Sequence, residues 1–159
     1  MNLPKRKSNR LEVYDYNTEG SYFVTICTAG KKKILSNLKF DNLTPINNLT
    51  EIGELIKTTI EYINENFAGI SIEKYVIMPN HIHLIINIDE VENPSKNRNQ
   101  QMLSKIISSI KKRTYKILDK SIWQASYYEH IIRDERDYYR VTEYIENNPY
   151  NWKDDEYFI

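Results

Sequence analysis

The sequence predicts an α+β fold, and three observations support this prediction. Four stretches rich in β-branched and aromatic residues are typical of strands, three stretches with apolar residues at helical spacing are typical of helices, and turn residues separate them. Their order is β-α-β-β-α-β followed by a further helix, which is the ferredoxin-like (RRM-like) pattern of an antiparallel sheet plus a C-terminal helix. The 159 residues, 40% of them hydrophobic, suit a single domain over residues 1–159.

The first strand and the first helix have clear local signals. Residues 22–28 are rich in aromatic and β-branched residues. The single cysteine, Cys27, cannot form an internal disulfide, and its apolar neighbours predict a buried strand position. Several asparagines and Pro45 predict irregular structure over residues 37–48. Apolar residues at helical spacing predict the first long helix from about residue 50 to residue 67.

A β-hairpin is predicted in the middle of the chain. Two strand-like runs, residues 70–78 and 81–88, are separated only by Pro79 and Asn80, so they should pair as antiparallel neighbours. Residues 89–99 are polar and predict a loop.

The C-terminal third of the chain supplies the remaining elements. Helical spacing predicts a second helix over residues 102–117, and residues 127–133 are typical of a fourth strand. Either Asp134 or Asp137 could cap a last helix. That helix should end before Pro149, because a proline pushes the residue before it out of the helical region.

Charge and hydropathy narrow the class of protein. The 22 basic and 22 acidic residues cancel, which argues against a protein that coats DNA non-specifically. Bases outnumber acids in residues 1–13 and 101–120, and acids outnumber bases from residue 127 onward, so one side could face phosphates. We expect no signal peptide, because no apolar stretch follows the N-terminal charges, and no membrane span, because no run reaches about 18 apolar residues. A reducing cytoplasm is the expected compartment.

His81 and His83 form the most informative pair in the sequence. A strand repeats every two residues, so both imidazoles should lie on one face while Ile82 points to the other. Two such histidines can converge on one divalent metal. The alternative is that they are two polar residues on a solvated strand face.

Tyr144 and Asn148 form a second pair, four residues apart on one face of the last helix. The Asn148 carbonyl suits a hard cation such as Mg²⁺ or Mn²⁺, and Tyr144 would then lie beside that metal as a nucleophile. From spacing alone, Tyr144 could equally be a core aromatic that packs with Val141 and Ile145.

Several blocks, in one order along the chain, carry a resemblance to a known family: residues 6–11 (RKSNRL), 14–16 (YDY), 20–28 (GSYFVTICT), 78–85 (MPNHIHLI), 123–124 (WQ), 127–133 (YYEHIIR) and 144–149 (YIENNP). The chain resembles the single-tyrosine (HUH) transposases of bacterial and archaeal insertion sequences, in the REP-associated branch.

The resemblance implies a reaction and a set of residues. Tyr144 would be the catalytic tyrosine on a catalytic C-terminal helix, and His81, His83 and Asn148 would bind a divalent metal, Mg²⁺ or Mn²⁺. The tyrosine would attack a DNA phosphodiester near a hairpin, leaving a 5′-phosphotyrosine link and a free 3′-OH that later rejoins strands. The other nearby tyrosines do not occupy the motif position: Tyr138, Tyr139 and Tyr150.

The expected partner is single-stranded or hairpin DNA, bound by a monomer or a homodimer. The basic residues that could hold its phosphates are Lys5, Arg6, Lys7, Arg10, Lys111, Lys112 and Arg113. Gln124 and His130 could support the metal site or contact DNA, and structural roles are equally open for both.

Two other functions remain open from the sequence. In the first, a metal-dependent nuclease activates water at the histidines and Tyr144 is structural. In the second, a domesticated, catalytically silent protein only binds hairpin DNA.

Overall fold

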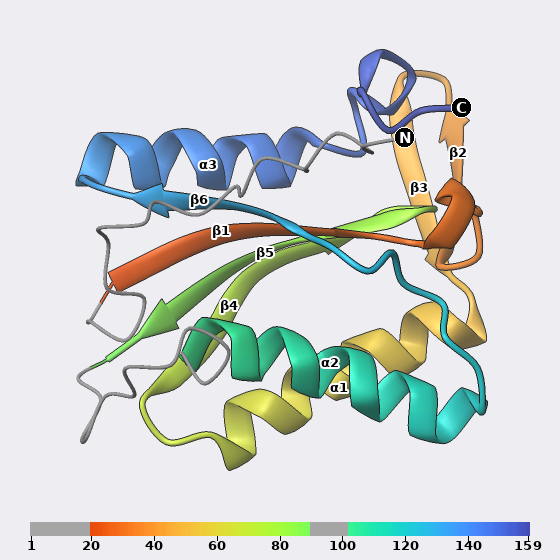
Figure 1. Cartoon of the computed structure of the whole chain (residues 1–159). Helices are drawn as coiled ribbons and strands as arrows, with labels where there is room; N and C mark the ends of the chain where they lie inside the picture. Colours follow the sequence, from red (N-terminus) through yellow and green to blue (C-terminus); the bar gives the residue numbers. More distant parts are fainter. Residues whose placement is uncertain (1–19, 90–101) are drawn as a thin grey trace, which may run out of the picture.

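The computed structural model describes residues 20–89 and 102–159 (Figure 1). The predicted loop over residues 89–99 lies almost wholly outside the described residues. The same holds for four of the proposed DNA-binding residues: Lys5, Arg6, Lys7 and Arg10.

A four-stranded antiparallel sheet forms the centre of the molecule. Its strands, in the spatial order β4-β5-β1-β6, are β4 (Ile70–Ile77), β5 (His81–Ile88), β1 (Gly20–Cys27) and β6 (Tyr128–Ile132). Helix α1 (Glu51–Asn66) connects β1 to β4, and α2 (Met102–Leu118) lies between β5 and β6 along the chain. This confirms the predicted ferredoxin-like β-α-β-β-α-β order.

Helices cover both faces of the sheet. Helices α1 and α2 lie on one face, and α3 (Glu135–Asn147) lies on the other (Figure 1). Alternate residues of β1 divide accordingly: Val24 joins the large buried cluster shared with α1 and α2, and Phe23 joins a smaller cluster with Val141 and Ile145 of α3. The sheet face beneath α3 therefore buries fewer apolar side chains than the opposite face.

The starts of α1 and α3 agree with the capping signals in the sequence. Thr50 Oγ1 accepts a hydrogen bond from Gly53 N at 3.1 Å, and the Asp134 carboxylate accepts one from Asp137 N at 2.8 Å. Asp134 is thus the cap of α3, which leaves the Asp137 carboxylate for other partners. Gly53 is required by close approach, because a Cβ there would collide with the Leu35 carbonyl oxygen.

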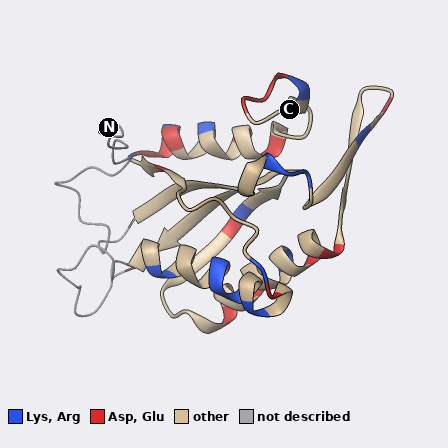
Figure 2. Cartoon of the chain, turned by 45° about the vertical axis from the view of Figure 1, so that its right-hand side comes forward, with Lys and Arg blue, Asp and Glu red and all other residues tan. Residues whose placement is uncertain are grey.

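The prediction of irregular structure over residues 37–48 is wrong. These residues lie in a two-stranded hairpin, β2 (Ser36–Asp41) and β3 (Thr44–Leu49), that projects away from the sheet (Figure 2). Pro45 is tolerated because a two-stranded ribbon leaves each strand with a free edge that needs no N–H donor. Asn42 takes a φ of 56° at the turn, a conformation that asparagine adopts more readily than most residues.

Two 3₁₀ turns complete the described chain, η1 (Ala29–Lys31) after β1 and η3 (Trp152–Asp154) after α3. Among the described residues, no helix combines the length and the apolar character that a membrane crossing needs.

Candidate active site

His81 and His83 lie on the sheet face that α3 covers. In the register of β5 against β1, they stand opposite Cys27 and Thr25. Both side chains are buried, and their Nε2 atoms are 3.0 Å apart. The two imidazoles therefore converge on one point, as the alternation of the strand predicts, and the solvated-face alternative does not describe them.

Asn80 determines which nitrogen of His81 carries the proton. Its Nδ2 donates to the Tyr157 carbonyl at 2.8 Å, so its Oδ1 is the acceptor that faces His81 Nδ1 at 2.8 Å. His81 Nδ1 must then be the donor, which leaves a lone pair on Nε2. His83 Nδ1 contacts Thr25 Oγ1 at 2.7 Å, and a hydroxyl can accept there, so His83 Nε2 can also present a lone pair.

Burial keeps both histidines neutral. It lowers the pKa of His81 from 6.5 to about 4, with a contact from Asn148 opposing the shift and the charge of Lys31 adding to it. Burial also holds the pKa of His83 well below its usual value, and its neighbour His81 acts in the same direction. A metal ligand must be the unprotonated imidazole, and here that form prevails at neutral pH.

Asn148 at the end of α3 and Asp155 after η3 lie near the histidine pair. Asn148 follows the helix directly and is buried, and its Nδ2 donates to Asp155 Oδ2 at 3.1 Å. Asn148 Oδ1 makes no hydrogen bond within the described residues, although it is buried. Ligand atoms of His81, His83 and Asp155 all lie within 4.8 Å of one another.

These donors fit a divalent cation. Two ligand atoms about 2.1 Å from one cation and at right angles to each other are about 3.0 Å apart, which is the separation of the two Nε2 atoms. An amide oxygen without a hydrogen bond and a carboxylate complete a mixed nitrogen and oxygen set. Asp155 could not be predicted from the sequence. It lies beyond Pro149, and no rule of helix or strand spacing places it beside β5, which is far away in the sequence.

Tyr144 lies beside the histidine pair and not in the core. Its ring centroid is 5.3 Å from that of His83, and 42% of the residue is exposed, whereas Val141 and Ile145 are buried. It lines a cavity of about 500 Å³ between α3 and the sheet. Burial, followed by the charges of Asp155 and Glu156, raises the pKa of Tyr144, so its phenol is protonated at neutral pH.

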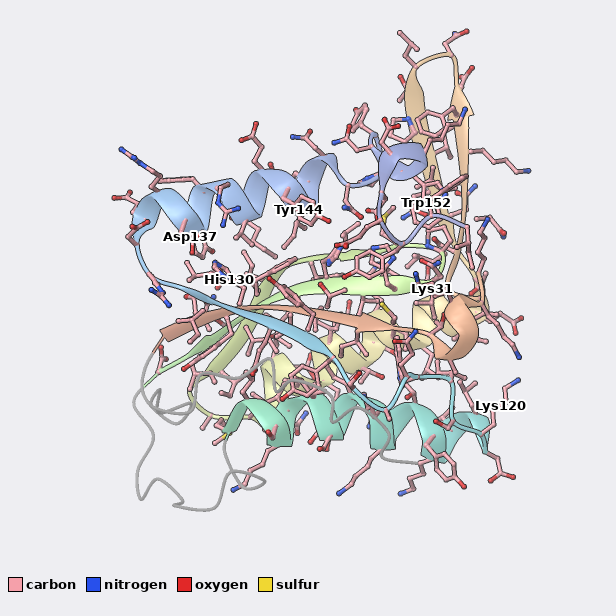
Figure 3. The ribbon with its side chains drawn as sticks, turned by 45° about the horizontal axis from the view of Figure 1, so that its top comes forward. Lys31, Lys120, His130, Asp137, Tyr144 and Trp152 are labelled. Carbon is pink, nitrogen blue, oxygen red and sulfur yellow. The ribbon has the colours of Figure 1, made fainter. Side chains whose placement is uncertain are left out.

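The C-terminal segment covers the other side of His81. The Tyr157 and Trp152 rings lie 4.5 Å and 5.9 Å from the His81 ring, centroid to centroid. Figure 3 shows Trp152 on the same side of the sheet as Tyr144 and Asp137. The hydrogen bond from Asn80 to the Tyr157 carbonyl connects this segment to the turn before β5.

The structure separates the remaining predicted residues into two layers. His130, on β6, lines the Tyr144 cavity, and Gln124 lines a neighbouring cavity with Thr25 and Tyr157. The basic cluster of Lys111, Lys112 and Arg113 lies on α2, in the layer opposite α3 (Figure 2).

Two members of that basic cluster have partners within the protein. Lys111 Nζ donates to the carbonyl of Gln124 at 2.8 Å, and Arg113 lies over the Tyr62 ring, 4.0 Å from its centroid. Only Lys112 is exposed. The α2 cluster therefore does not border the histidine pair or Tyr144.

A family model supplies the comparison that decides the family. Residues 46–148 match the model described as "Transposase IS200 like", and this segment holds both histidines, Tyr144 and Asn148. The chain belongs to the IS200-like transposase family.

Two relatives match most of this chain. An uncharacterized protein of Haemophilus influenzae is 34% identical, over 97% of this chain and 93% of its own length. A second protein of that organism, named "Putative REP-associated tyrosine transposase", is 29% identical over 85% of this chain and 73% of its length.

The structure of a REP-associated tyrosine transposase bound to a REP hairpin has a TM-score of 0.64. Its sequence is 23% identical to this chain, and the match covers 88% of this chain and 73% of the solved one. At this identity the match supports the fold alone. The matched segment of this IS200-like transposase ends at Asn148, so Asp155 and Tyr157 lie beyond it.

Proposed function

We propose that this IS200-like transposase cleaves and rejoins single-stranded DNA beside hairpins, with Tyr144 as the nucleophile. One observation carries the proposal. Tyr144 lines a solvent-accessible cavity, and its ring lies 5.3 Å from His83, one of two buried, neutral histidines whose Nε2 atoms converge. A nucleophile beside a set of metal ligands is an arrangement that supports phosphodiester transfer.

His81, His83 and Asn148 would hold the cation, Mg²⁺ or Mn²⁺, and Asp155 is a fourth candidate ligand. When bound, such a cation supplies positive charge that polarises the scissile phosphate and offsets the charge that develops on it. The chain prepares this site in advance, because Asn80 and Thr25 fix the outer nitrogens of the two imidazoles.

In the cleavage step, Tyr144 Oη forms a bond to phosphorus while the bond from phosphorus to the 3′ oxygen breaks. The proton that the phenol loses is balanced by the proton that the 3′ oxygen gains. The product is a 5′-phosphotyrosine link and a free 3′-OH. Attack of that 3′-OH on the link reverses the step, and the link conserves the bond energy of the phosphodiester, so no outside energy source is needed.

The proposed partner is single-stranded DNA next to a hairpin. The name of one Haemophilus influenzae relative and the REP hairpin bound by the structural neighbour support this choice. The exposed Tyr128 ring beside the cavity offers a face on which an unstacked base can lie.

A covalent-adduct assay tests the proposal. The substrates are 5′- and 3′-labelled hairpin oligonucleotides copied from palindromes that flank the gene, incubated with Mn²⁺ or with EDTA. We expect the parent to form an adduct that survives denaturing electrophoresis, and Tyr144→Phe to form none. Tyr139→Phe is the matched control, because Tyr139 lies on the same helix and is 63% exposed.

The two rival functions give different results in this assay. A nuclease that activates water would leave Tyr144→Phe cleaving at the parent rate, with no adduct from either protein. A catalytically silent binding protein would retain hairpin binding without cleavage. Either result would contradict Tyr144 as the nucleophile.

A further inference from the structure

Arg140 lies one helical turn before Tyr144 and lines the same cavity. The two residues are four apart on α3, so their Cβ atoms are neighbours on one helix face. Tyr128 and His130 of β6 line the cavity from the sheet side. Arg140 is the only lysine or arginine among the described residues that line it.

Asp137 holds the Arg140 guanidinium. Arg140 Nη2 donates to Asp137 Oδ1 at 2.6 Å, and His130 Nε2 donates to Asp137 Oδ2 at 2.7 Å. The Arg133 backbone N–H adds a longer bond of 3.4 Å to the same oxygen. Figure 3 shows Asp137 on α3 and His130 on β6, lying toward one another across the space between helix and sheet.

This arrangement differs from an ordinary surface ion pair. The Asp137 side chain is only 16% exposed, and its donors come from two elements that pack against each other. Burial works against the charged form of Asp137, but the hydrogen bonds from Arg140 and His130 outweigh burial and lower the pKa of the carboxyl. The Asp137 carboxylate is thus charged, and it holds the guanidinium of Arg140 through one hydrogen bond at the wall of the cavity.

Most donors of Arg140 remain available. A guanidinium carries five N–H groups in one plane, and the bond to Asp137 is the only one that Arg140 makes within the described residues. The Arg140 side chain is 69% exposed, so the other donors can reach a ligand in the cavity. Their planar fork matches the two free oxygens of a phosphodiester.

We propose that Arg140 binds a phosphate of the DNA strand that Tyr144 attacks, and that His130 and Asp137 position its guanidinium. The inference rests on the proposed function, since it places that strand in the cavity. The Glu156 carboxylate lines the cavity too, and its negative charge would repel a phosphate. The guanidinium of Arg140 supplies the positive charge that offsets this repulsion.

Neutralising single phosphates tests the contact directly. Hairpin oligonucleotides with one methylphosphonate at successive positions of the single-stranded flank are titrated against protein, and binding is followed by fluorescence anisotropy. Every protein in this experiment, including the parent, carries Tyr144→Phe, so that DNA cleavage does not interfere with the binding measurement. With the unmodified flank, Arg140→Gln should bind about 10-fold or more weakly, because a charge-assisted, bidentate contact is lost.

One position of the flank should identify the contact. There, the methylphosphonate should weaken binding by the parent and leave Arg140→Gln unaffected, so the two proteins bind that substrate alike. Arg136→Gln is the matched control, because it removes the same charge from an exposed position of α3 that does not line the cavity. It should change binding little, and equally at every position.

Two further variants separate positioning from folding. Arg140→Lys keeps the charge but loses the fork, so it should recover only part of the affinity. Asp137→Asn should weaken binding at the same phosphate position, while leaving the circular dichroism spectrum and the response to methylphosphonates elsewhere unchanged. A loss at every position equally would assign Asp137 a purely structural role and overturn the positioning part.

The results distinguish this inference from the proposed function. Equal affinities for the parent and Arg140→Gln, or equal losses in Arg140→Gln and Arg136→Gln, overturn the role of Arg140 even where the Tyr144 adduct forms. A parent protein that does not bind the hairpin contradicts both.

Discussion

The free energy of unfolding should fall between pH 7 and pH 5, because His81 is buried in its neutral form. Burial lowers the pKa of His81 from 6.5 to about 4, so at pH 5 the unfolded chain binds a proton that the folded chain does not. The stability is therefore complete above about pH 6.5 and is lost progressively as the pH falls toward 4. These two pKa values correspond to a loss of about 2 kcal/mol between pH 7 and pH 5.

Two neighbouring groups also contribute to this pH dependence. The lowered pKa of His83 adds a further loss over the same range. Burial raises the pKa of Asp155, which acts in the opposite direction, because its folded state takes up a proton at a higher pH than the unfolded state does.

Urea denaturation of the parent and of His81→Gln, at both pH values and with EDTA present, measures the effect. Comparing the loss between pH 7 and pH 5 within each protein cancels the direct effect of the substitution on stability. The parent should lose about 2 kcal/mol more than His81→Gln, with an unchanged dependence on urea. Equal losses would refute the reasoning, since other groups would then account for the whole pH dependence.

Three further substitutions test the metal site, the fold and the DNA surface. Thr25→Val should weaken Mn²⁺ binding about 10- to 100-fold in calorimetric titration, because the hydroxyl that bonds His83 is lost; unchanged affinity would remove Thr25 from the site. Gly53→Ala should lower the free energy of unfolding by about 1–3 kcal/mol in urea, because the new Cβ collides with a backbone carbonyl, and parent-like stability would contradict that close approach. Tyr128→Ala should weaken binding of single-stranded DNA by about 1–3 kcal/mol through lost stacking. Tyr115→Ala, an exposed position on α2, is its control, and equal losses would argue against stacking at Tyr128.

Apolar spacing was enough to predict most of the fold. It predicted both helices that cover the large cluster and α3, because each helix buries one regular face, and runs of apolar and β-branched residues predicted β1 and the hairpin of β4 and β5. The β2 and β3 hairpin was missed because it buries little. Few strongly apolar residues take part in its alternating pattern of burial. Its strands also contain Pro45 and several asparagines, which are residues typical of turns.

The candidate site also contains residues that the sequence could predict and one that it could not. The pairs His81 with His83 and Tyr144 with Asn148 each follow from the period of one element, so the sequence alone could nominate them. The position of Asp155 depends instead on how the segment after Pro149 folds back. The contacts that direct it, such as the Asn80 bond to the Tyr157 carbonyl, join residues far apart in sequence and have no periodic signature.

Arg140 was visible in the sequence only as one charge among many on an acidic helix. Its distinguishing feature is the carboxylate of Asp137, which the sequence suggested as a possible helix cap. Asp134 takes that role in the structure, and this frees the Asp137 side chain to join His130 and Arg140.

The unequal apolar clusters on the two faces of the sheet have a dynamic consequence. The α3 layer rests on four buried apolar residues, Phe23, Ile85, Val141 and Ile145, whereas α1 and α2 share the large cluster. Segments with little buried apolar surface open locally at lower free energy than the global core. We therefore expect amide hydrogens of α3 to exchange faster than those of α1, with the helix that carries Tyr144 undocking as a unit from an intact sheet. The fraction of time that α3 spends docked would then set how often the tyrosine faces its histidines.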